Sequence, residues 1–279
     1  MKVYAHTLVK NDARWLWYAV SSVINHVDKV LLWDAGSSDE SLIIEKELIE
    51  AYPSKIEFRQ REQNTIEDFK NVRQEMLDAT NSDWFIVVDA DEIWYEESIK
   101  GVIEVLKSSS QNIESVVVPT INLVGDIFHY QNSSAGRYRF GNRVGHYNLR
   151  AVKRTIPGLH SQGIHGIWGW ADNENKMIQD RGEDRLKFVD LPYLHTTFLQ
   201  RSTNRIKDLE VIKRSKKLKY EFGESFPKDF YYPEVFFKSR PKYIYSPWHT
   251  MSSDFKFRAS LETPLRILKR KIWWGRAGY

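Results

Sequence analysis

An apolar run that ends in acidic residues constrains the fold of this chain most strongly. Residues Trp84-Phe-Ile-Val-Val88 carry no polar side chain, and Asp89, Asp91 and Glu92 follow at once. A run that is apolar without alternation predicts a strand covered on both faces, as in a parallel sheet between two layers of helices. Such sheets place their ligand sites just beyond the carboxyl ends of the strands. We therefore expect the acidic residues to lie in a functional site.

The spacing of the two aspartates indicates a divalent cation. In an extended backbone, residues two apart point to the same side, so Asp89 and Asp91 could converge on one hard cation with oxygen ligands. The alternative is a solvated turn after a strand, because Asp-x-Asp is a common tripeptide. The rest of the chain has to decide between these two interpretations.

Length and composition are those of a folded globular protein without disulfides. The 279 residues can hold one large or two small domains, and an apolar fraction of 42% is ordinary. The chain has no cysteine, which excludes disulfides and thiolate metal sites and fits a reducing cytoplasm. No apolar stretch is long enough for a signal peptide or a membrane span, so we expect a cytoplasmic protein.

The formal charge of +4 is modest, but the basic residues collect late in the chain. This asymmetry suggests that the C-terminal part meets an anionic surface or substrate. Nucleic acid is the weakest candidate, because the basic segments 213–219 and 266–271 are expected to be helical and lack a regular series of stacking aromatics.

Strands and amphipathic helices alternate through the first part of the chain. This alternation predicts an α/β fold of the Rossmann type, with a right-handed, mainly parallel sheet sandwiched by helices. Beyond residue 124 the pattern loosens, and a helix after Ser202 is expected to run into the basic stretch. Strands are expected at 2–8, 30–33, 56–59, 84–88, 115–123, 147–153 and 187–195.

Four short motifs occur in an order typical of one enzyme family. They are Thr7-Leu-Val-Lys-Asn-Asp12, Trp33-Asp-Ala-Gly-Ser-Ser-Asp39, Phe69-Lys-Asn-Val-Arg73 and Val88-Asp-Ala-Asp-Glu92. In order and spacing they resemble glycosyltransferase family 2, whose members have the GT-A fold. The resemblance covers roughly the first 125 residues. It implies sugar transfer, with inversion, from a nucleotide diphosphate donor such as a UDP-sugar to an acceptor hydroxyl.

The resemblance implies a metal site. Asp89 and Asp91 would hold Mn²⁺ or Mg²⁺ on the diphosphate, and GT-A enzymes often add a histidine further downstream. His195, at the end of an expected strand, fits that place best, and imidazole is a competent ligand for Mn²⁺. The alternatives are a buried structural role for this histidine, and His160 or His165 as the ligand.

The nucleotide would contact the end of the first strand and the Asp-x-Gly-Ser turn. Asp34 follows a buried strand, so its carboxylate could accept from ribose hydroxyls or a base N–H, although Asp also caps turns and helices. A divalent cation and nearby Arg or Lys would stabilise the charge that accumulates on the departing diphosphate. The implied contacts are Thr7, Leu8, Val9, Asp34, Asp39, Arg73 and Ala90.

The general base must lie within hydrogen-bond reach of the acceptor hydroxyl. The stretch Arg181-Gly-Glu-Asp-Arg185 resembles the Glu-Asp motif that carries the base in many relatives. Asp184 is therefore the first candidate, with Asp172 and His165 behind it. Gly166 stands where the family often has glutamate, which is a departure from the pattern. The alternative for the Glu-Asp motif is a solvated loop.

These assignments divide the chain into three parts. Residues 1–123 would bind the nucleotide-sugar, residues 124–200 would complete the same domain and bind the acceptor, and residues 201–279 would form a helical, basic and aromatic extension. The acceptor would be a glycan or a lipid-linked molecule in envelope polysaccharide synthesis. Two other functions compete: a catalytically idle nucleotide- or carbohydrate-binding module, and a haloacid dehalogenase-type phosphatase, which usually carries Asp-x-Asp on its first strand.

The C-terminal segment has the pattern of a basic amphipathic helix. Leu261, Leu265, Leu268 and Ile272 recur at helical spacing, Arg and Lys occupy other faces, and Trp273-Trp274 follow. Such a helix can lie in the headgroup layer of an anionic membrane, which would place the protein peripherally on its inner face. The alternative is a terminal helix that packs its leucines on the catalytic domain.

Overall fold

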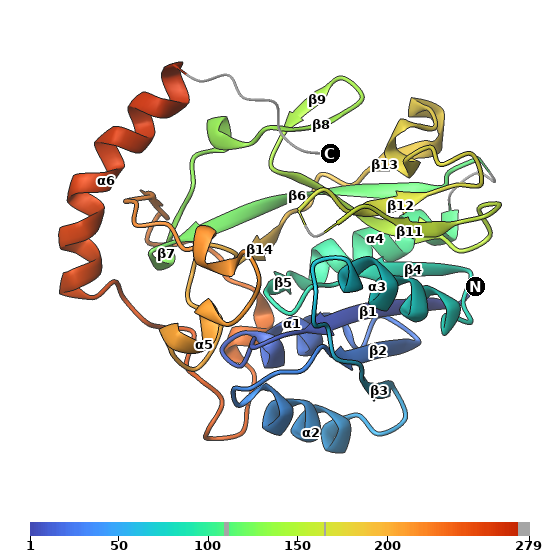
Figure 1. The fold of residues 1–279 in the computed structure, drawn as a ribbon, viewed down its shortest axis with the longest axis horizontal. Helices are drawn as coiled ribbons and strands as arrows, with labels where there is room; N and C mark the ends of the chain where they lie inside the picture. The colour runs from blue at the N-terminus through green and yellow to red at the C-terminus, as the bar shows by residue number, and fades with distance from the viewer. Residues whose placement is uncertain (109–111, 165, 273–279) are drawn as a thin grey trace.

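One large mixed sheet organises the molecule. The structure, a computed structural model, describes residues 1–108, 112–164 and 166–272. Within these ranges, eleven strands form the main sheet and two short hairpins lie beside it (Figure 1). The α/β class predicted from the sequence is confirmed.

The strands of the first part run parallel, as predicted. β1 (Val3–Val9) pairs with β2 (Lys29–Asp34) on one side and with β4 (Trp84–Val87) on the other, and β3 (Ile56–Gln60) extends the sheet beyond β2. The register aligns the last residue of β1 with the last residue of β2. The carboxyl ends of these strands therefore meet at one edge.

A strand from the second part of the chain is inserted into this sheet. β10 (Tyr147–Lys153) lies antiparallel between β4 and β6 (Ser115–Val124). The strand expected at 187–195 is divided into β13 (Leu186–Phe188) and β14 (Tyr193–His195), both parallel to β6. Pro192 lies between them, and proline cannot donate a ladder hydrogen bond.

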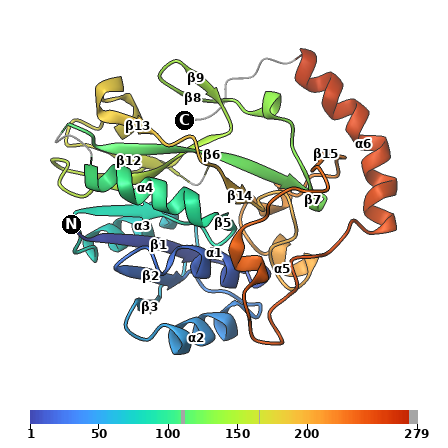
Figure 2. The same ribbon diagram turned by 180° about the vertical axis from the view of Figure 1, so that it is seen from behind.

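Helices cover both faces of the sheet, which explains the uninterrupted apolar run of β4. Ile86 and Val88 pack in the core cluster that includes α1 and α4, whereas Phe85 and Val87 pack in a cluster on the opposite face. Figure 1 shows α3 on one face and Figure 2, from behind, shows α1 and α4 on the other. The helices are α1 (Leu16–Val23), α2 (Ser41–Ala51), α3 (Asp68–Asp78) and α4 (Glu96–Ser108).

Shorter elements complete the fold. β7 (Asp126–Tyr130) and β15 (Glu224–Ser225) extend the main sheet beyond β6, and β5 (Glu92–Trp94) pairs with β14. The two hairpins are β8 (Tyr138–Phe140) with β9 (Arg143–Gly145), and β11 (His160–Gln162) with β12 (Gly169–Ala171). Within the described ranges, no helix combines the length and apolarity needed to cross a bilayer.

The predicted basic helix over residues 213–219 is wrong. α5 covers only Arg205–Leu209, and Asn204 caps it by accepting from the backbone N–H of Lys207 at 3.1 Å. Lys213 adopts a left-handed backbone (φ 62°), which ends any helical path, and only a single 3₁₀ turn follows. A long helix does form at the C-terminal end, where α6 spans Ser253–Ile272.

Glu45 is an exception within the buried face of α2, beside Ile44 and Leu48. Its side chain is completely buried, and neither carboxyl oxygen has a hydrogen-bond partner in the part of the chain that the structure describes. Burial raises the pKa of Glu45 to about 9, and the nearby carboxylates of Asp34 and Asp39 act in the same direction. Glu45 is therefore protonated in the folded protein at neutral pH.

This buried carboxyl group should make stability fall as pH rises. An unfolded Glu ionises near pH 4.3 while the folded Glu45 keeps its proton, so between that pH and about 9 the folded state binds more protons. Glu45→Gln removes this penalty, and since each pH unit in this window is worth about 1.4 kcal/mol, we expect its gain in unfolding free energy to grow by about 4 kcal/mol from pH 5 to pH 8. Urea unfolding between these pH values measures it.

Glu50→Gln on the same helix is the matched control, because the Glu50 side chain is 62% exposed. It should leave the slope of stability against pH unchanged. Identical slopes for wild type and Glu45→Gln would contradict the assignment of a protonated Glu45.

Candidate active site

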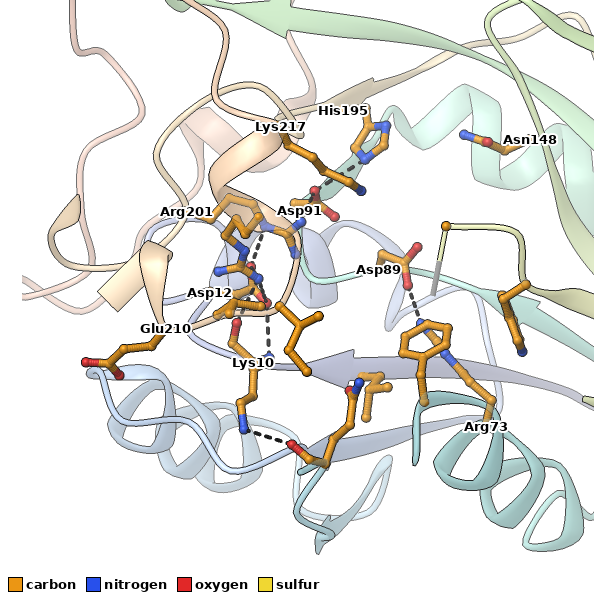
Figure 3. Close-up of a pocket in the computed structure, with 18 of the residues that line it drawn as sticks. Lys10, Asp12, Arg73, Asp89, Asp91, Asn148, His195, Arg201, Glu210 and Lys217 are labelled. Atoms are coloured by element: carbon orange, nitrogen blue, oxygen red, sulfur yellow. Dashed lines mark hydrogen bonds and ion pairs between the residues drawn. The ribbon is translucent and has the colours of Figure 1, made fainter. Parts of the chain in front are cut away.

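A cavity of about 430 Å³ opens where the carboxyl ends of β1 and β4 meet residues of β10 and β14. All three parts of the chain line it, and Figure 3 shows their side chains pointing into a common space. Its charged lining holds six Lys or Arg side chains and four carboxylates, so positive charge is in excess. These are Lys10, Arg73, Arg150, Arg201, Arg214 and Lys217, with Asp12, Asp89, Asp91 and Glu210.

Asp89 and Asp91, which follow β4, lie in a turn, and Glu92 begins β5. The backbone N–H of Glu92 donates to the carbonyl oxygen of Asp89 at 3.0 Å, and the N–H of Asp89 donates to Glu92 Oε2 at 3.2 Å. The extended backbone expected for Asp89 and Asp91 is therefore wrong. Their side chains take different partners and do not converge on one point (Figure 3).

Asp89 is held by two arginines. Arg73 Nη2 donates to Asp89 Oδ1 at 2.5 Å, and Arg150 Nη1 lies 3.6 Å from Asp89 Oδ2. Burial would raise the pKa of Asp89, but the two guanidinium groups outweigh burial and lower it. The Arg73 guanidinium lies over the rings of Phe69 and Trp168. Its Nε and Nη1 are buried and have no hydrogen-bond partner among the residues that the structure describes. Arg73 thus keeps donors available for an anion.

Asp91 pairs with His195, the last residue of β14, and with Arg201, which follows it in the chain. Its Oδ2 lies 2.6 Å from Arg201 Nη1 and 3.3 Å from His195 Nε2. Burial would raise the pKa of Asp91, but Arg201 and His195 hold it well below its usual range. Burial lowers the pKa of His195, with Asp91 opposing, so this imidazole is neutral at neutral pH.

Asp12 connects the extension to the end of β1. Arg201 Nε donates to Asp12 Oδ1 at 2.5 Å, and Arg214 Nη2 donates to the same oxygen at 3.1 Å. Arg214 also donates to the backbone carbonyl of Lys10 at 2.7 Å. Lys217 lies nearby, where burial lowers its pKa and Asp91 opposes that effect. The basic stretch after α5 therefore turns inward as a wall of the cavity.

Asp91 and His195 fit a divalent cation by their donor chemistry. A buried carboxylate and a neutral imidazole 3.3 Å apart suit Mn²⁺. Within the described residues, Asp91 Oδ2 forms an ion pair with Arg201 but no hydrogen bond of regular geometry. Arg201 lies on the same oxygen, and Asp89 is held separately by Arg73. Among the described residues, no three His, Asp or Glu side chains gather into a metal site.

The predicted nucleotide contacts are divided between the cavity and the core. Leu8 and Arg73 line the cavity, whereas Asp34 Oδ1 accepts from the backbone N–H groups of Gly36 and Ser37, both at 2.9 Å. Asp39 accepts from the N–H of Ser41, the first residue of α2, at 2.9 Å. Thr7, Val9 and Ala90 are buried beside the cavity without lining it. The roles of these residues toward a nucleotide stay predictions.

Asp184 and Asp172, two of the candidate bases, do not line the cavity. Asp184 is exposed on a 3₁₀ turn, and Asp172 is buried against Arg181. Asp172 also accepts from the backbone N–H groups of Glu174 and Lys176, both at 2.9 Å. His165 lies outside the described residues, and the alternative ligand His160 contacts a backbone carbonyl away from the cavity. The identity of the base stays a prediction.

The cations of the extension were missed as site residues. Arg201, Arg214 and Lys217 follow His195 within about two dozen residues, and their density was the available signal. Because the basic stretch was predicted to be a helix, its Arg and Lys side chains were expected to face solvent. Lys10 and Asp12 were also missed, although both belong to the first of the four sequence motifs.

The sequence matches the model of one protein family. A family model described as Glycosyl transferase family 2 matches residues 6–164, more than half of the chain. No curated protein matches the sequence.

Solved structures with a similar fold include the following three. One is glucosyl-3-phosphoglycerate synthase from Mycobacterium tuberculosis with Mn²⁺, UDP and glucosyl-3-phosphoglycerate, at 15% identity and TM-score 0.46, covering 78% of this chain and 77% of that one. Another is mannosyltransferase PcManGT from Pyrobaculum calidifontis with GDP-Man and Mn²⁺. Its sequence identity is 14% and its TM-score 0.45, and the match covers 78% of this chain and 61% of that one. The third is S. aureus TarS, at 12% identity and TM-score 0.46, with a match that covers 78% of this chain and 69% of that one. At these identities and TM-scores the similarities carry no further argument.

Arg201 should be important for stability, because it neutralises two buried carboxylates. Arg201→Met leaves Asp12 and Asp91 without a shared cation, and we expect a loss of about 3–5 kcal/mol in unfolding free energy. Arg61→Met is the matched control, because Arg61 is 32% exposed and pairs with Glu75 at the surface. That change should cost less than about 1 kcal/mol. Equal losses in urea unfolding would contradict the role of Arg201.

Proposed function

This chain belongs to glycosyl transferase family 2, and from that membership we propose that it transfers a sugar from a nucleotide diphosphate, first of all a UDP-sugar, to an acceptor hydroxyl. The chain is a glycosyltransferase by its family; the donor, the acceptor and an inverting course belong to the proposal. The observation that carries it is the cation-rich cavity at the carboxyl ends of β1 and β4, which Asp89 and Asp91 line from the turn that follows β4.

The excess of positive charge suits the diphosphate of the donor. When the bond between the anomeric carbon and the diphosphate oxygen breaks, negative charge accumulates on the departing diphosphate. Arg201 and Lys217 lie beside Asp91, and Arg73 has buried donors without partners, so these groups can donate charge-assisted hydrogen bonds to the leaving group. Preformed cations in a buried cavity stabilise that charge more than water would.

Asp91 and His195 would hold the divalent cation, Mn²⁺ or Mg²⁺, and Asp89 would remain with Arg73 and Arg150. When bound, the cation supplies Lewis-acid stabilisation of the diphosphate. The chain's own task is to keep Asp91 ionised and His195 neutral, and the surrounding charges and burial support both states.

The proposal also includes the acceptor. We take it to be a glycan or lipid-linked molecule used in envelope polysaccharide synthesis, which would place the protein at the inner face of a membrane. Asn148, Tyr138 and Trp168 line the cavity from the second part of the chain and offer hydrogen-bonding and ring surfaces of the kind that sugars contact. A panel of UDP- and GDP-sugars, tested for Mn²⁺-dependent hydrolysis and transfer, examines donor and reaction together.

Asp91→Asn should abolish metal-dependent donor binding and reduce transfer by at least about 10²-fold, because an amide is a poor ligand for the cation and a weaker partner for Arg201. Titration of UDP with and without Mn²⁺, followed by calorimetry, measures binding, and circular dichroism checks the fold. Asp190→Asn, at a position 64% exposed, is the control and should behave like wild type. Normal turnover by Asp91→Asn would remove Asp91 from the site; wild-type binding of UDP without turnover of any donor would indicate an idle binding module.

The base is tested by a substitution that leaves the donor site untouched. If Asp184 acts as base, Asp184→Asn should lower the transfer rate by about 10²- to 10⁴-fold while the affinity for UDP stays at the wild-type value. Asp172→Asn is the comparison, and because Asp172 is paired with Arg181 it should mainly reduce stability. Wild-type rates for Asp184→Asn would move the role to His165 or Asp172.

A further inference from the structure

The apolar side of α6 faces solvent. Phe257, Leu261, Leu265 and Leu268 recur at spacings of four, four and three residues, which places them on one stripe of the helix. Their side chains are 71%, 61%, 68% and 54% exposed, in that order. A helix that packs on its own domain normally buries such a stripe, so the expected alternative of leucines packed on the catalytic domain does not occur.

The opposite side of α6 attaches to the body through mainly polar contacts. Arg270 donates to both carboxylate oxygens of Glu221, each at 2.5 Å, and Thr263 Oγ1 accepts from the backbone N–H of Phe222 at 2.9 Å. Ala259 is the fully buried residue on this side. These contacts fix the rotation of the helix about its axis, so the exposed stripe is a consequence of how α6 is held.

The position of α6 leaves the stripe accessible. Both views show the helix along the outer edge of the molecule, beyond the end of the main sheet that β7 and β15 form (Figure 1 and Figure 2). Ile267 beside the stripe is also exposed, at 46%. A contiguous exposed apolar surface of this kind marks an interaction site more often than chance exposure does.

The charge of α6 indicates an anionic partner. Its sequence carries six Lys or Arg residues against two acidic residues, an excess that equals the formal charge of the whole chain. A second copy of the same helix would bring equal positive charges together, which opposes self-association. An anionic surface offers the complementary charge. The basic residues are Lys256, Arg258, Arg266, Lys269, Arg270 and Lys271.

We propose that α6 docks on a lipid bilayer with anionic headgroups, lying in the plane of the interface with Phe257, Leu261, Leu265 and Leu268 inserted. A helix with one apolar face and flanking cations gains both apolar burial and attraction to anionic lipid in this orientation. This docking rests on the proposed function in one respect: a bilayer would present the lipid-linked acceptors that the proposed reaction uses. Trp273 and Trp274, which were also expected to meet the membrane, lie outside the described residues.

The test uses the full chain and sedimentation with vesicles in the absence of any nucleotide. Vesicles of phosphatidylcholine with about one third phosphatidylglycerol should bind the wild type, pure phosphatidylcholine should bind it much less, and high salt should release it. Leu261→Gln with Leu265→Gln should lower the partition coefficient by at least about tenfold, because the two middle residues of the inserted stripe no longer bury apolar surface. Inorganic phosphate at millimolar concentration should not compete, since a free anion cannot replace apolar insertion.

The matched control is Ile43→Gln with Val144→Gln, two exposed apolar residues elsewhere at 55% and 52%, which should leave vesicle binding unchanged. Lys256→Glu with Lys269→Glu should weaken binding to anionic vesicles without changing the fold. Equal sedimentation of wild type and the double leucine variant would overturn the proposal.

The same variants distinguish a lipid surface from a second copy. Analytical ultracentrifugation without vesicles should show the same mass for wild type and the double leucine variant; a dimer that this variant dissociates would overturn the lipid assignment. UDP binding in solution should be equal in both proteins. A protein that binds vesicles but turns over no donor would leave the docking proposal standing and remove the proposed transfer reaction.

Discussion

The structure depends on the pairing of charges that have been removed from water. Asp12 and Asp91 are buried at the carboxyl ends of the parallel strands, and an isolated buried carboxylate would cost several kcal/mol. Arg201 neutralises both, and Arg214 adds a second cation to Asp12. These arginines come from the last third of the chain, so the extension completes the electrostatics of the first half. These paired side chains also line the cavity. Because the cations there outnumber the carboxylates, the cavity keeps an excess of positive charge.

Much of the fold could be predicted because its signals are local. The run from Trp84 to Val88 is apolar on both faces since both faces are covered, and the alternation of strands and helices gave the parallel order of β1 to β4. The predicted family, the α/β GT-A-like class and the assignment as a glycosyltransferase are confirmed. The motifs that carried the resemblance lie mostly at the ends of these strands, where the sequence of a single segment determines the local geometry.

Long-range contacts were beyond prediction from single segments. The basic stretch 213–219 has the composition of an exposed helix, yet Arg214 turns inward because Asp12, two hundred residues earlier, needs a cation. Likewise, periodicity located the apolar stripe of α6 but could not show which side faces the body, since Glu221 and Arg270 decide that. The Asp89–Asp91 turn departs from a strand because Glu92 accepts from the backbone N–H of Asp89. In the first two cases the partner lies far away in the sequence, whereas Glu92 lies in the same segment as Asp89 and acts through a side-chain contact that hydrophobic periodicity does not report.

The insertion of β10 between β4 and β6 has a consequence for biosynthesis. While the chain emerges from the ribosome, β1 to β4 can pair with one another, but the free edge of β4 has no neighbour until residue 153 is synthesised. A hydrophobic strand with an open edge is prone to pair with other chains. The nascent protein must therefore pass through a stage in which its most apolar strand is the unprotected border of a half-built sheet, and slow elongation over residues 95–153 would prolong that exposure.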